Sequence, residues 1–589
     1  MKIKLKTKRV SQTLSRREFL TLTAGTSLAL LAAGCGRRKK ETPIPNPPAI
    51  STSAPLETRP TPSGTPDLVI KNGKVFTMDQ GNTTAQAVAI KDGLIQAVGK
   101  DKAISALAGP ATQVIDAGGR VVTPGLIDPH IHMRAVGFNY TYYTPFMPPE
   151  TVDNQSLQEA LAKVIQTKAP GEWIMGYYMV DRDGIFTKDV IDPVSPDNPV
   201  FIIHIGGHWG TANSAAMKAA NVTAATKDPT GGIIDRGKNG EPTGIFYNHR
   251  AMDVLRIAAP PITDDITRDA ILQTQPVLAA AGVTSFQDNN IRDLGAIKAY
   301  QDLSRDGQMY LRNDLYYTLE WPSNLDKIGE IDHFENEFSH FTGYKFLIDG
   351  QVPTAFCHQP HNGKSWNTSA WDPPTYKKAI RTLHDTGLQI CVHCVGDAAT
   401  DLTLDAYEEA MNANPRPDPR HRIEHAILTT PQATKRIKDL GVVMSVNPQF
   451  IFVGGDTYES IFGKDRLKRI IVTREWLDAG IHVTIGSDAP SVPWPTPQVT
   501  IAGAISRLTF SQNVIGQDQC LTVIEALRAH TIEAAYAAHQ ENIKGSVEAG
   551  KLADITIWPI DPTSASLKEL FNMAPMFMTI VGGKVVHKA

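Results

Sequence analysis

One stretch of the chain decides its fold: Pro124-Gly125-Leu126-Ile127-Asp128-Pro129-His130-Ile131-His132. The apolar run that begins at Leu126 predicts a buried β-strand, and that strand ends in two histidines. Because side chains alternate along a strand, His130 and His132 present both imidazoles to the same face. Two neutral imidazoles side by side suit a transition metal. The stretch therefore predicts a metal site at the carboxyl end of a strand.

Seven further apolar runs follow, mostly separated by helix-like segments. With the first, the eight runs are residues 126–132, 282–288, 310–318, 344–349, 388–394, 422–428, 442–447 and 482–488. Strands that alternate with helices predict parallel βαβ units, and eight such units close a barrel. We therefore expect an α/β fold, a (β/α)8 TIM barrel over residues 124–543, with the metal site at its mouth.

The rest of the chain surrounds this barrel. The long gap between the first two runs predicts an insertion near the mouth at about residues 133–281, with a hairpin that turns at Asn239-Gly240. Residues 67–76 and 87–98 predict two more hairpins, which turn at Asn72-Gly73 and Asp92-Gly93. Short strands of the same kind recur near the C-terminus. We expect residues 67–123 and 544–589 to form one small β-sandwich domain.

Three more metal-ligand side chains fall at the ends of later predicted strands. His393 belongs to the fifth run, His425 to the sixth and Asp488 to the eighth. In the eighth run Thr484, Gly486 and Asp488 share one face, so Asp488 is expected to point inward. The carboxyl ends of barrel strands meet at one rim, which brings these side chains to the first histidine pair.

Further motifs accompany these residues. They are Asn213-Ser214, Gly231-Gly232, Gly240-Glu-Pro-Thr-Gly244, Gly396-Asp397, Arg422-Ile-Glu-His425, Gly486-Ser487-Asp488-Ala489-Pro490, Gly545-Ser546 and Gly550-Lys551-Leu-Ala-Asp554. From about Asp67 to its end, the chain resembles the amidohydrolase superfamily in its amidohydrolase-3 (YtcJ-like) branch. The resemblance implies that His130 and His132 bind the more buried metal and that His393 and His425 bind a second. It also implies that Asp488 contacts the metal and handles the proton.

The resemblance further implies a carboxylated lysine between the metals, and the matching residue is Lys345 on the fourth predicted strand. Two cations close together repel each other, and a lysine carbamate supplies the bridging anion. An unmodified Lys345 would instead snorkel or pair with Asp349, and one metal ion would then be expected. Zinc is the expected metal, with manganese, iron, nickel or cobalt as alternatives.

Together these residues predict a hydrolase of a non-peptide C–N bond in an amide, a cyclic amide or an N-acyl or formamide-type group. A metal-activated hydroxide would attack the carbonyl, with Asp488 as general base and then general acid. The alternatives are an esterase, a deaminase or a decarboxylase on the same scaffold, and a non-catalytic solute-binding lipoprotein. Superfamily deaminases carry H-x-x-E after the fifth-strand histidine, whereas this chain has Gly396 in place of the glutamate.

His208 is the second candidate catalytic residue. The glycines before it, Gly206 and Gly207, let the backbone approach a substrate closely, so His208 could orient a substrate carbonyl. A loop histidine without function is the alternative. Weaker candidates are Asn213, Tyr247, Asp288, Arg422 and Arg507. The histidines expected to be structural are His358, His361, His384 and His421.

Composition limits the class of partner. The 589 residues are 42% hydrophobic and carry a formal net charge of −3, with no basic run beyond the extreme N-terminus. Nucleic acid is therefore excluded as a partner, and a small-molecule substrate is expected.

Five cysteines are too few, and odd in number, for a disulfide framework. Cys391 and Cys394 form a C-x-x-C that is typical of a buried strand.

The N-terminus resembles an export signal over residues 1–35. Ser15-Arg16-Arg17-Glu18-Phe19-Leu20 resembles a twin-arginine motif, and Leu31-Ala-Ala-Gly-Cys35 resembles a lipobox. Residues 36–66, rich in proline, serine and threonine, predict a disordered linker. We expect twin-arginine export, to give a periplasmic or extracytoplasmic membrane-anchored lipoprotein whose lipid anchor at Cys35 is the membrane contact. An uncleaved N-terminal anchor is the alternative, and a homodimer is left open.

Overall fold

The computed structural model describes residues 59–589, apart from 149, 179–185, 230–231, 320–327, 329–330, 332–333, 361–368 and 370. The predicted export signal, Cys35 and His361 lie outside the described residues, as does the predicted linker up to residue 58. Among the helices of the described part, none is both long and apolar enough to cross a bilayer.

Eight parallel strands form the central sheet, in the order β21-β20-β19-β18-β17-β16-β15-β8. They are β8 (Leu126–Ile131), β15 (Val283–Ile291), β16 (Arg312–Leu319), β17 (Ser339–Leu347), β18 (Gln389–Cys394), β19 (Arg422–His425), β20 (Val443–Val446) and β21 (Val483–Ile485). The first and last strands meet at the mouth, where Asp488 N donates to His130 O at 2.7 Å and His132 N to Ala489 O at 2.8 Å. The chain therefore folds as a (β/α)8 TIM barrel, as predicted.

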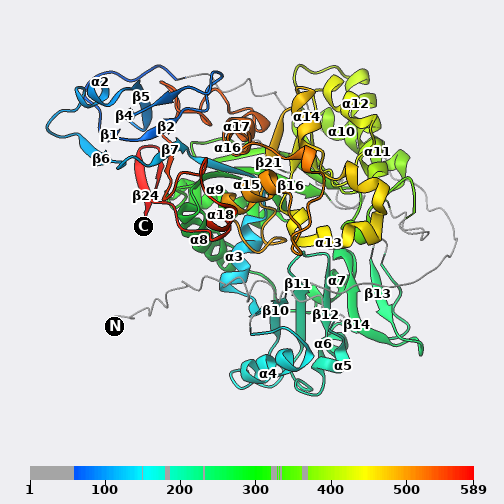
Figure 1. Cartoon of the computed structure of the whole chain (residues 1–589). Coiled ribbons are helices and arrows are strands. Elements are labelled where there is room, and N and C mark those ends of the chain that lie inside the picture. Colours follow the sequence, from blue (N-terminus) through cyan, green and yellow to red (C-terminus); the bar gives the residue numbers. More distant parts are fainter. Residues whose placement is uncertain are drawn as a thin grey trace.

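Helices pack around this sheet (Figure 1). They are α3 (Met133–Thr141), α8 (Asp264–Ala280), α9 (Leu294–Arg305), α10 (Pro373–His384), α11 (Asp397–Ala413), α12 (Ala433–Asp439), α13 (Phe450–Phe462), α14 (Thr473–Asp478), α15 (Pro497–Ser506), α16 (Val523–Ala529), α17 (Ile532–Ala537) and α18 (Leu567–Phe571). Each predicted apolar run overlaps one barrel strand. The largest difference is in β17, which begins at Ser339 rather than Tyr344, because polar His340 and Thr342 interrupt its apolar pattern.

The inside of the barrel below the mouth is polar. Tyr316 donates to Oε1 of Gln389 at 2.7 Å, and Arg422 donates to Oε1 of Gln287. Nε2 of Gln389 donates to the carbonyl of Ala537 at 2.8 Å, so α17 closes the lower end. These side chains are wholly or almost wholly buried. Because buried polar groups need partners, this network holds the strands in one arrangement beneath the mouth.

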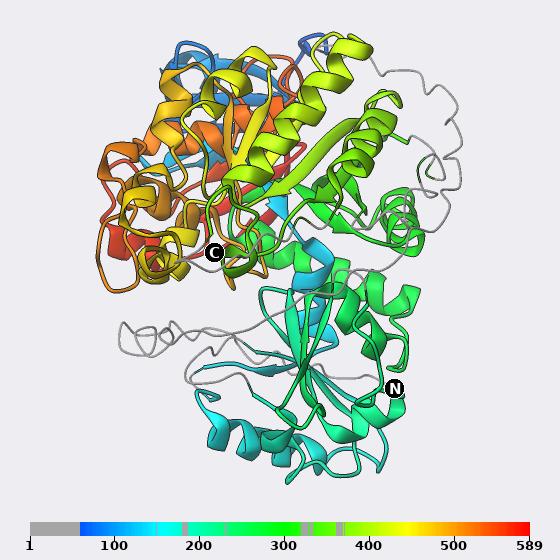
Figure 2. The same ribbon diagram turned by 90° about the vertical axis from the view of Figure 1, so that its right-hand side faces the viewer.

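The segment between β8 and β15 folds into a lobe of its own (Figures 1 and 2). Its sheet has the order β13-β14-β12-β11-β10-β9. The strands are β9 (Thr144–Phe146), β10 (Ile174–Tyr178), β11 (Val200–His204), β12 (Trp209–Ala212), β13 (Ile233–Arg236) and β14 (Pro242–Tyr247). The helices between them are α4 (Asn154–Ile165), α5 (Lys188–Ile191), α6 (Ser214–Ala219) and α7 (Asn248–Arg256). The predicted hairpin at Asn239-Gly240 joins β13 to β14 and is confirmed.

Two further sheets lie beside the barrel, in the orders β5-β4-β1-β6 and β24-β23-β22-β7-β2-β3. Their strands are β1 (Leu68–Lys71), β2 (Lys74–Phe76), β3 (Thr84–Ala85), β4 (Ala87–Lys91), β5 (Leu94–Gly99), β6 (Gln113–Asp116), β7 (Val121–Pro124), β22 (Ile555–Ile557), β23 (Met578–Val581) and β24 (Lys584–Lys588), and α2 (Asp101–Ser105) lies among them. Residues of both sheets, Leu68 and Ile555 among them, share one buried apolar cluster. The predicted sandwich arrangement stays a prediction.

The hairpin predicted at Asn72-Gly73 is wrong. β1 pairs with β4 and β6, whereas β2 pairs with β3 and β7, so this turn carries the chain from one sheet to the other. Asn72 is held on the side of the first sheet, because its Nδ2 donates to Oδ1 of Asp116 at 2.9 Å. The hairpin predicted at Asp92-Gly93 does join β4 to β5.

A buried ion pair links the lower end of the barrel to the C-terminal segment. Nε of Arg312 in β16 lies 2.8 Å from Oδ2 of Asp554, just before β22. The side chain of Arg312 is 2% exposed and that of Asp554 is 5% exposed. Two charges buried this deeply depend on each other, because either one alone would be desolvated without compensation.

We expect Asp554→Asn to lower the free energy of unfolding by about 3–5 kcal/mol, because the buried Arg312 guanidinium loses its buried counter-charge and keeps only the exposed Glu337 at 3.6 Å. Chemical denaturation of the purified chain measures this change. Asp439→Asn is the matched control, since Asp439 pairs with Lys435 on the surface and should change stability by less than about 1 kcal/mol. Equal effects of the two substitutions would contradict the structural role of the buried pair.

Two histidines expected to be structural form a buried relay. The Ile390 N–H donates to Nδ1 of His421, Nε2 of His421 bonds Nδ1 of His384 at 2.8 Å, and Nε2 of His384 donates to Asn414 O. Each ring then carries one proton, so both histidines are neutral. Burial lowers the pKa of His421 well below its ordinary value and also lowers the pKa of His384.

These lowered pKa values predict acid lability. A histidine whose pKa is lower in the folded chain stabilises the fold above the unfolded pKa of about 6.5 and loses that contribution as the pH falls below it. We expect the free energy of unfolding to fall steadily from pH 7 to pH 5. Denaturant titrations at several pH values measure this slope. His421→Gln should be less stable at pH 7 but show a shallower slope, and an unchanged slope would exclude the relay as a source.

Candidate metal centre

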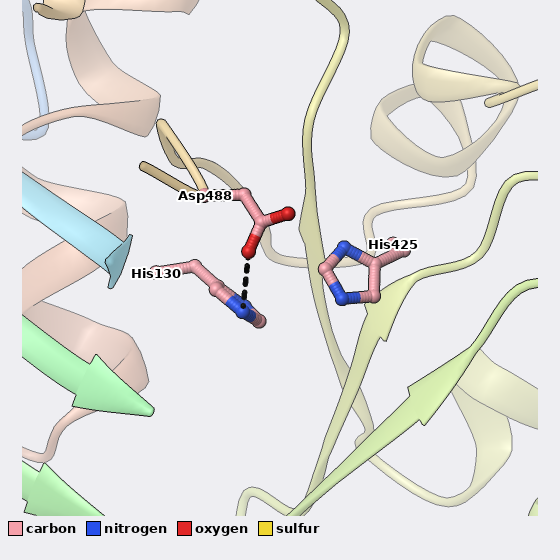
Figure 3. Close-up of side chains that lie close together, drawn as sticks. All are labelled: His130, His425 and Asp488. Carbon is pink, nitrogen blue, oxygen red and sulfur yellow. Dashed lines mark ion pairs between the residues drawn. The ribbon is translucent and has the colours of Figure 1, made fainter. Parts of the chain in front are cut away.

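Three predicted ligands gather at the mouth of the barrel. His130 at the end of β8, His425 at the end of β19 and Asp488 after β21 each offer one ligand atom, and these atoms lie within 4.8 Å of one another. All three residues are buried. Figure 3 shows the two imidazoles entering from different strands, with the Asp488 carboxylate beside them. The predicted convergence of strand ends therefore produces a compact group of donors.

The backbone bends to bring two of these side chains inward. His425 has φ +71° and Asp488 has φ +51°, a left-handed conformation that non-glycine residues rarely adopt. Regular alternation would place His425 on the outer face with Ile423, whereas the bend turns its ring to the mouth. Strain of this kind persists where surrounding structure holds it, often at functional sites.

A close strand contact helps to place the donors. A Cβ on Gly486 would lie 2.8 Å from the backbone nitrogen of His130, so only glycine lets the chain after β21 approach β8 this closely. The approach also allows the hydrogen bond from Asp488 N to His130 O. This glycine therefore sets the separation of two of the three donors.

Glu424 orients His130 and was missed in the sequence analysis. Nδ1 of His130 lies 2.5 Å from Oε2 of Glu424, and Nε of Arg422 donates to Oε1 at 2.7 Å. Burial would raise the pKa of Glu424, but Arg422 and His130 outweigh it and hold that pKa well below its usual range. The ionised Glu424 accepts a hydrogen bond from the N–H at Nδ1 of His130, which leaves Nε2 of His130 free to bind a metal. The signal in the sequence was the alternation of Arg422 and Glu424 on one strand face.

Asn447 orients His425 in the same way. Nδ1 of His425 donates to Oδ1 of Asn447 at 2.7 Å, and Nδ2 of Asn447 donates to the carbonyl of Gly486 at 2.8 Å. The ring of His425 also stacks on Phe450. Nε2 of His425 is therefore the nitrogen that faces the other donors. Asn447 closes the seventh predicted run, but nothing in its immediate sequence distinguished it.

The other three predicted ligands surround this group. Nε2 of His132 lies 3.0 Å from Oδ1 of Asp488, and Nζ of Lys345 lies 3.4 Å from Nε2 of His130. The ring of His393 is 4.6 Å from that of His425, while its Nε2 donates to Gly350 O at 3.2 Å. Asp349 does not pair with Lys345 but accepts backbone N–H groups, including that of Gly396 at 2.8 Å.

The surroundings shift the pKa values of Asp488 and Lys345. Burial would raise the pKa of Asp488, but the imidazoles of His130 and His132 beside its carboxylate outweigh burial and hold that pKa well below its usual range. Asp488 is therefore ionised. Burial lowers the pKa of Lys345, which raises the fraction of the uncharged amine.

A cavity of about 90 Å³ lies over these donors, and the inserted lobe forms part of its wall. His208, in the loop between β11 and β12, lines it, and its ring is 5.9 Å from that of His393. Burial lowers the pKa of His208 to about 4, so its ring is neutral at neutral pH. His249 and Arg292 also line the cavity, and Nη2 of Arg292 donates to Nε2 of His249 at 2.9 Å. These two were not predicted.

The weaker candidates lie away from the cavity. Asn213 caps α6, and Oδ2 of Asp288 accepts from Tyr300 at 2.8 Å behind β15. Arg507 donates to the carbonyls of Ile470 and Ile471. Arg422 lies below the candidate metal centre, where it donates to the hydroxyl of Ser445. Tyr247 ends β14 in the inserted lobe, outside the residues that line the cavity. The two cysteines of the C-x-x-C motif, Cys391 and Cys394, are free thiols buried in β18.

A family model described as the amidohydrolase family matches residues 113–587. The chain belongs to the amidohydrolase family. The predicted resemblance to the amidohydrolase-3 branch is confirmed, and this amidohydrolase is a hydrolase that acts on carbon–nitrogen bonds.

Several known proteins are similar to this amidohydrolase along most of its length. Protein LONG AFTER FAR-RED 3 of Arabidopsis thaliana is 30% identical and aligns over 88% of this chain and 91% of its own length. N-substituted formamide deformylase of Arthrobacter pascens is 29% identical over 86% of this chain and 95% of that enzyme. The solved structure of an uncharacterized metal-dependent hydrolase from Pyrococcus horikoshii OT3 has a TM-score of 0.69 at 22% identity, covering 85% of this chain and 99% of that one. That likeness supports the fold.

The donors of this amidohydrolase fit a divalent metal ion. Two imidazole nitrogens and one carboxylate oxygen are typical ligands of such ions. The remaining ring nitrogens of His130 and His425 are held by Glu424 and Asn447, which fixes the orientation that a metal ligand needs. The site is therefore built for a divalent ion in both its donors and the residues that orient them.

We expect Glu424→Gln to weaken the affinity for a divalent ion by about 10- to 100-fold, because His130 loses its charged partner. Competition with a chromophoric chelator measures the affinity, and circular dichroism verifies that the variant is folded. Glu541→Gln is the control, since Glu541 pairs with Arg420 and does not line the cavity. Equal affinity of Glu424→Gln and the unsubstituted protein would contradict the role of Glu424.

Proposed function

We propose that this amidohydrolase removes a small acyl group from an N-substituted amide with the help of a bound divalent metal ion. The first candidate for the acyl group is formyl, and the first candidate for the metal is zinc. The observation that carries this proposal is the group of His130, His425 and Asp488 at the floor of a cavity of only about 90 Å³. A cavity of that size over the donors has room for a small acyl group. The similarity to N-substituted formamide deformylase, along 95% of that enzyme, supports the same substrate class.

The metal would be held by His130, His132, His393, His425 and Asp488. When bound, it would supply a Lewis acid that polarises the carbonyl and makes water nucleophilic near neutral pH. A second ion would require Lys345 as its carbamate. The buried, uncharged amine favoured by its lowered pKa is the form that can react with carbon dioxide.

The remaining steps use side chains of the chain itself. Asp488, ionised and buried, would accept a proton at a carboxylate oxygen and pass it to the leaving nitrogen. His208, neutral and in the cavity wall, would donate a hydrogen bond to the substrate carbonyl and orient it. The inserted lobe, which carries His208, would also keep bulk water from the acyl group.

Release of formate from N-substituted formamides tests this proposal. We expect the zinc-loaded protein to release formate, and we expect a chelator to abolish the release until zinc is restored. Asp488→Asn should lower kcat by about 10²- to 10⁴-fold while most bound metal is kept, because the proton acceptor is lost. Asp253→Asn is the control, since Asp253 pairs with Arg256 on the surface of α7.

Two results would overturn the proposal. A metal-loaded protein that releases neither formate nor another small acid from any amide in the series would exclude the substrate class. Near-normal kcat in Asp488→Asn would remove Asp488 from its assigned role.

A further inference from the structure

Asn289 lies in β15 at the level of the candidate metal centre. It is 1% exposed and is one of the residues that line the cavity. Its neighbour Asp288 turns the other way, toward Tyr300, as alternation along a strand requires. Asn289 therefore faces into the barrel beside the proposed reacting groups.

The orientation of its side-chain amide is set by two hydrogen bonds. Nδ2 of Asn289 donates to the carbonyl of Pro129 at 3.1 Å and to the carbonyl of Gln287 at 3.2 Å. The reversed amide would place its oxygen against both carbonyl oxygens, which cannot donate. Both N–H donors are therefore occupied, and Oδ1 is the atom left to interact with a neighbour.

Oδ1 of Asn289 is buried and has no hydrogen-bond partner among the described residues. Most buried polar atoms in folded proteins are bonded, and an unbonded one costs about 1–3 kcal/mol. An acceptor left unbonded at a cavity wall is complementary to a ligand that brings a donor. Hydrogen-bond complementarity of this kind is a common basis of substrate selection.

The other polar groups of the cavity wall favour an amide as that ligand. Arg292 can only donate, and His208 is neutral and would donate to the carbonyl. Asp488 is directed at His130 and His132. A group with one acceptor and one donor, C=O and N–H, would match a wall that offers these donors together with the unbonded oxygen of Asn289.

We propose that Asn289 accepts a hydrogen bond from the N–H of the substrate amide and thereby selects N-monosubstituted amides over N,N-disubstituted amides and esters. The inference rests on the proposed function and names the substrate class within it. Asn289 acts here as a specificity-determining residue that contacts the substrate.

The first test needs only the unsubstituted zinc-loaded protein. It compares the formamide of a primary amine with the formamide of the same amine carrying an N-methyl group. We expect kcat/KM for the N–H substrate to be at least about 100-fold higher, because the methylated substrate leaves Oδ1 unbonded and crowds it. Values within about threefold of each other would overturn the proposal.

The second test uses Asn289→Leu, which keeps the number and branching of the side-chain heavy atoms but removes the acceptor. For a formamide and the formate ester of matching shape, we expect the ratio of kcat/KM, amide over ester, to fall by about 10- to 100-fold relative to the unsubstituted protein. A fold defect or metal loss would lower both activities together and leave the ratio unchanged. An unchanged ratio in a folded, metal-loaded variant would overturn the proposal.

Asn313→Leu is the matched control. Asn313 is fully buried near the start of β16, at the opposite end of the barrel, and its amide atoms have no hydrogen-bond partner among the described residues. Its substitution should leave the amide-to-ester ratio unchanged, and a fall equal to that in Asn289→Leu would overturn the assignment to Asn289.

Failure of this inference is distinguishable from failure of the proposed function. If the protein hydrolyses N–H and N-methyl formamides equally well, the function stands and the role of Asn289 is wrong. If neither substrate is hydrolysed by the metal-loaded protein, the substrate class itself is wrong, and the role given to Asn289 falls with it.

Discussion

The arrangement of the candidate metal centre depends on one buried contact, the hydrogen bond between His130 and Glu424. Arg422 donates to both oxygens of Glu424, and this guanidinium also donates to the carbonyl of Pro129 at 2.8 Å. Arg422 therefore holds β8 and β19 together while it keeps Glu424 ionised. A charge this deep is stable only when it is paired and hydrogen-bonded. The contacts of Arg422 and Glu424 thus set both the distance between β8 and β19 and the tautomer of His130, a proposed metal ligand.

The barrel and the inserted lobe contribute different parts of the site. The barrel supplies rigid donors at strand ends, and its polar interior is closed below by α17. The lobe supplies His208 from a loop, with Gly207 at φ +74°, a backbone conformation that glycine adopts freely. We infer that the barrel supplies the groups that carry out the chemistry and that the lobe determines the shape of the small cavity. Variation in such loops, with a constant barrel, is how this fold serves different substrates.

Much of this could be predicted from local sequence. The eight strands and the convergence of His130, His425 and Asp488 follow from apolar runs that end in ligand side chains. The passage of the chain from one sheet to the other at Asn72-Gly73 could not be predicted, because a turn dipeptide does not show which strands pair. Glu424, Asn447 and Asn289 also escaped prediction, because each acts on a partner far away in the chain. The bend at His425 reverses the alternation on which a strand-based argument depends. The roles of the ligands and of Lys345 stay predictions.

The position of a bound ion tests this account most directly. Crystals of the zinc-loaded protein, measured at the zinc absorption edge, would locate the ion by its anomalous scattering. The account predicts an ion bound to Nε2 of His130, to Nε2 of His425 and to the carboxylate of Asp488, with Glu424 still bonded to Nδ1 of His130. An ion elsewhere in the chain, or a protein that takes up no stoichiometric metal, would contradict it.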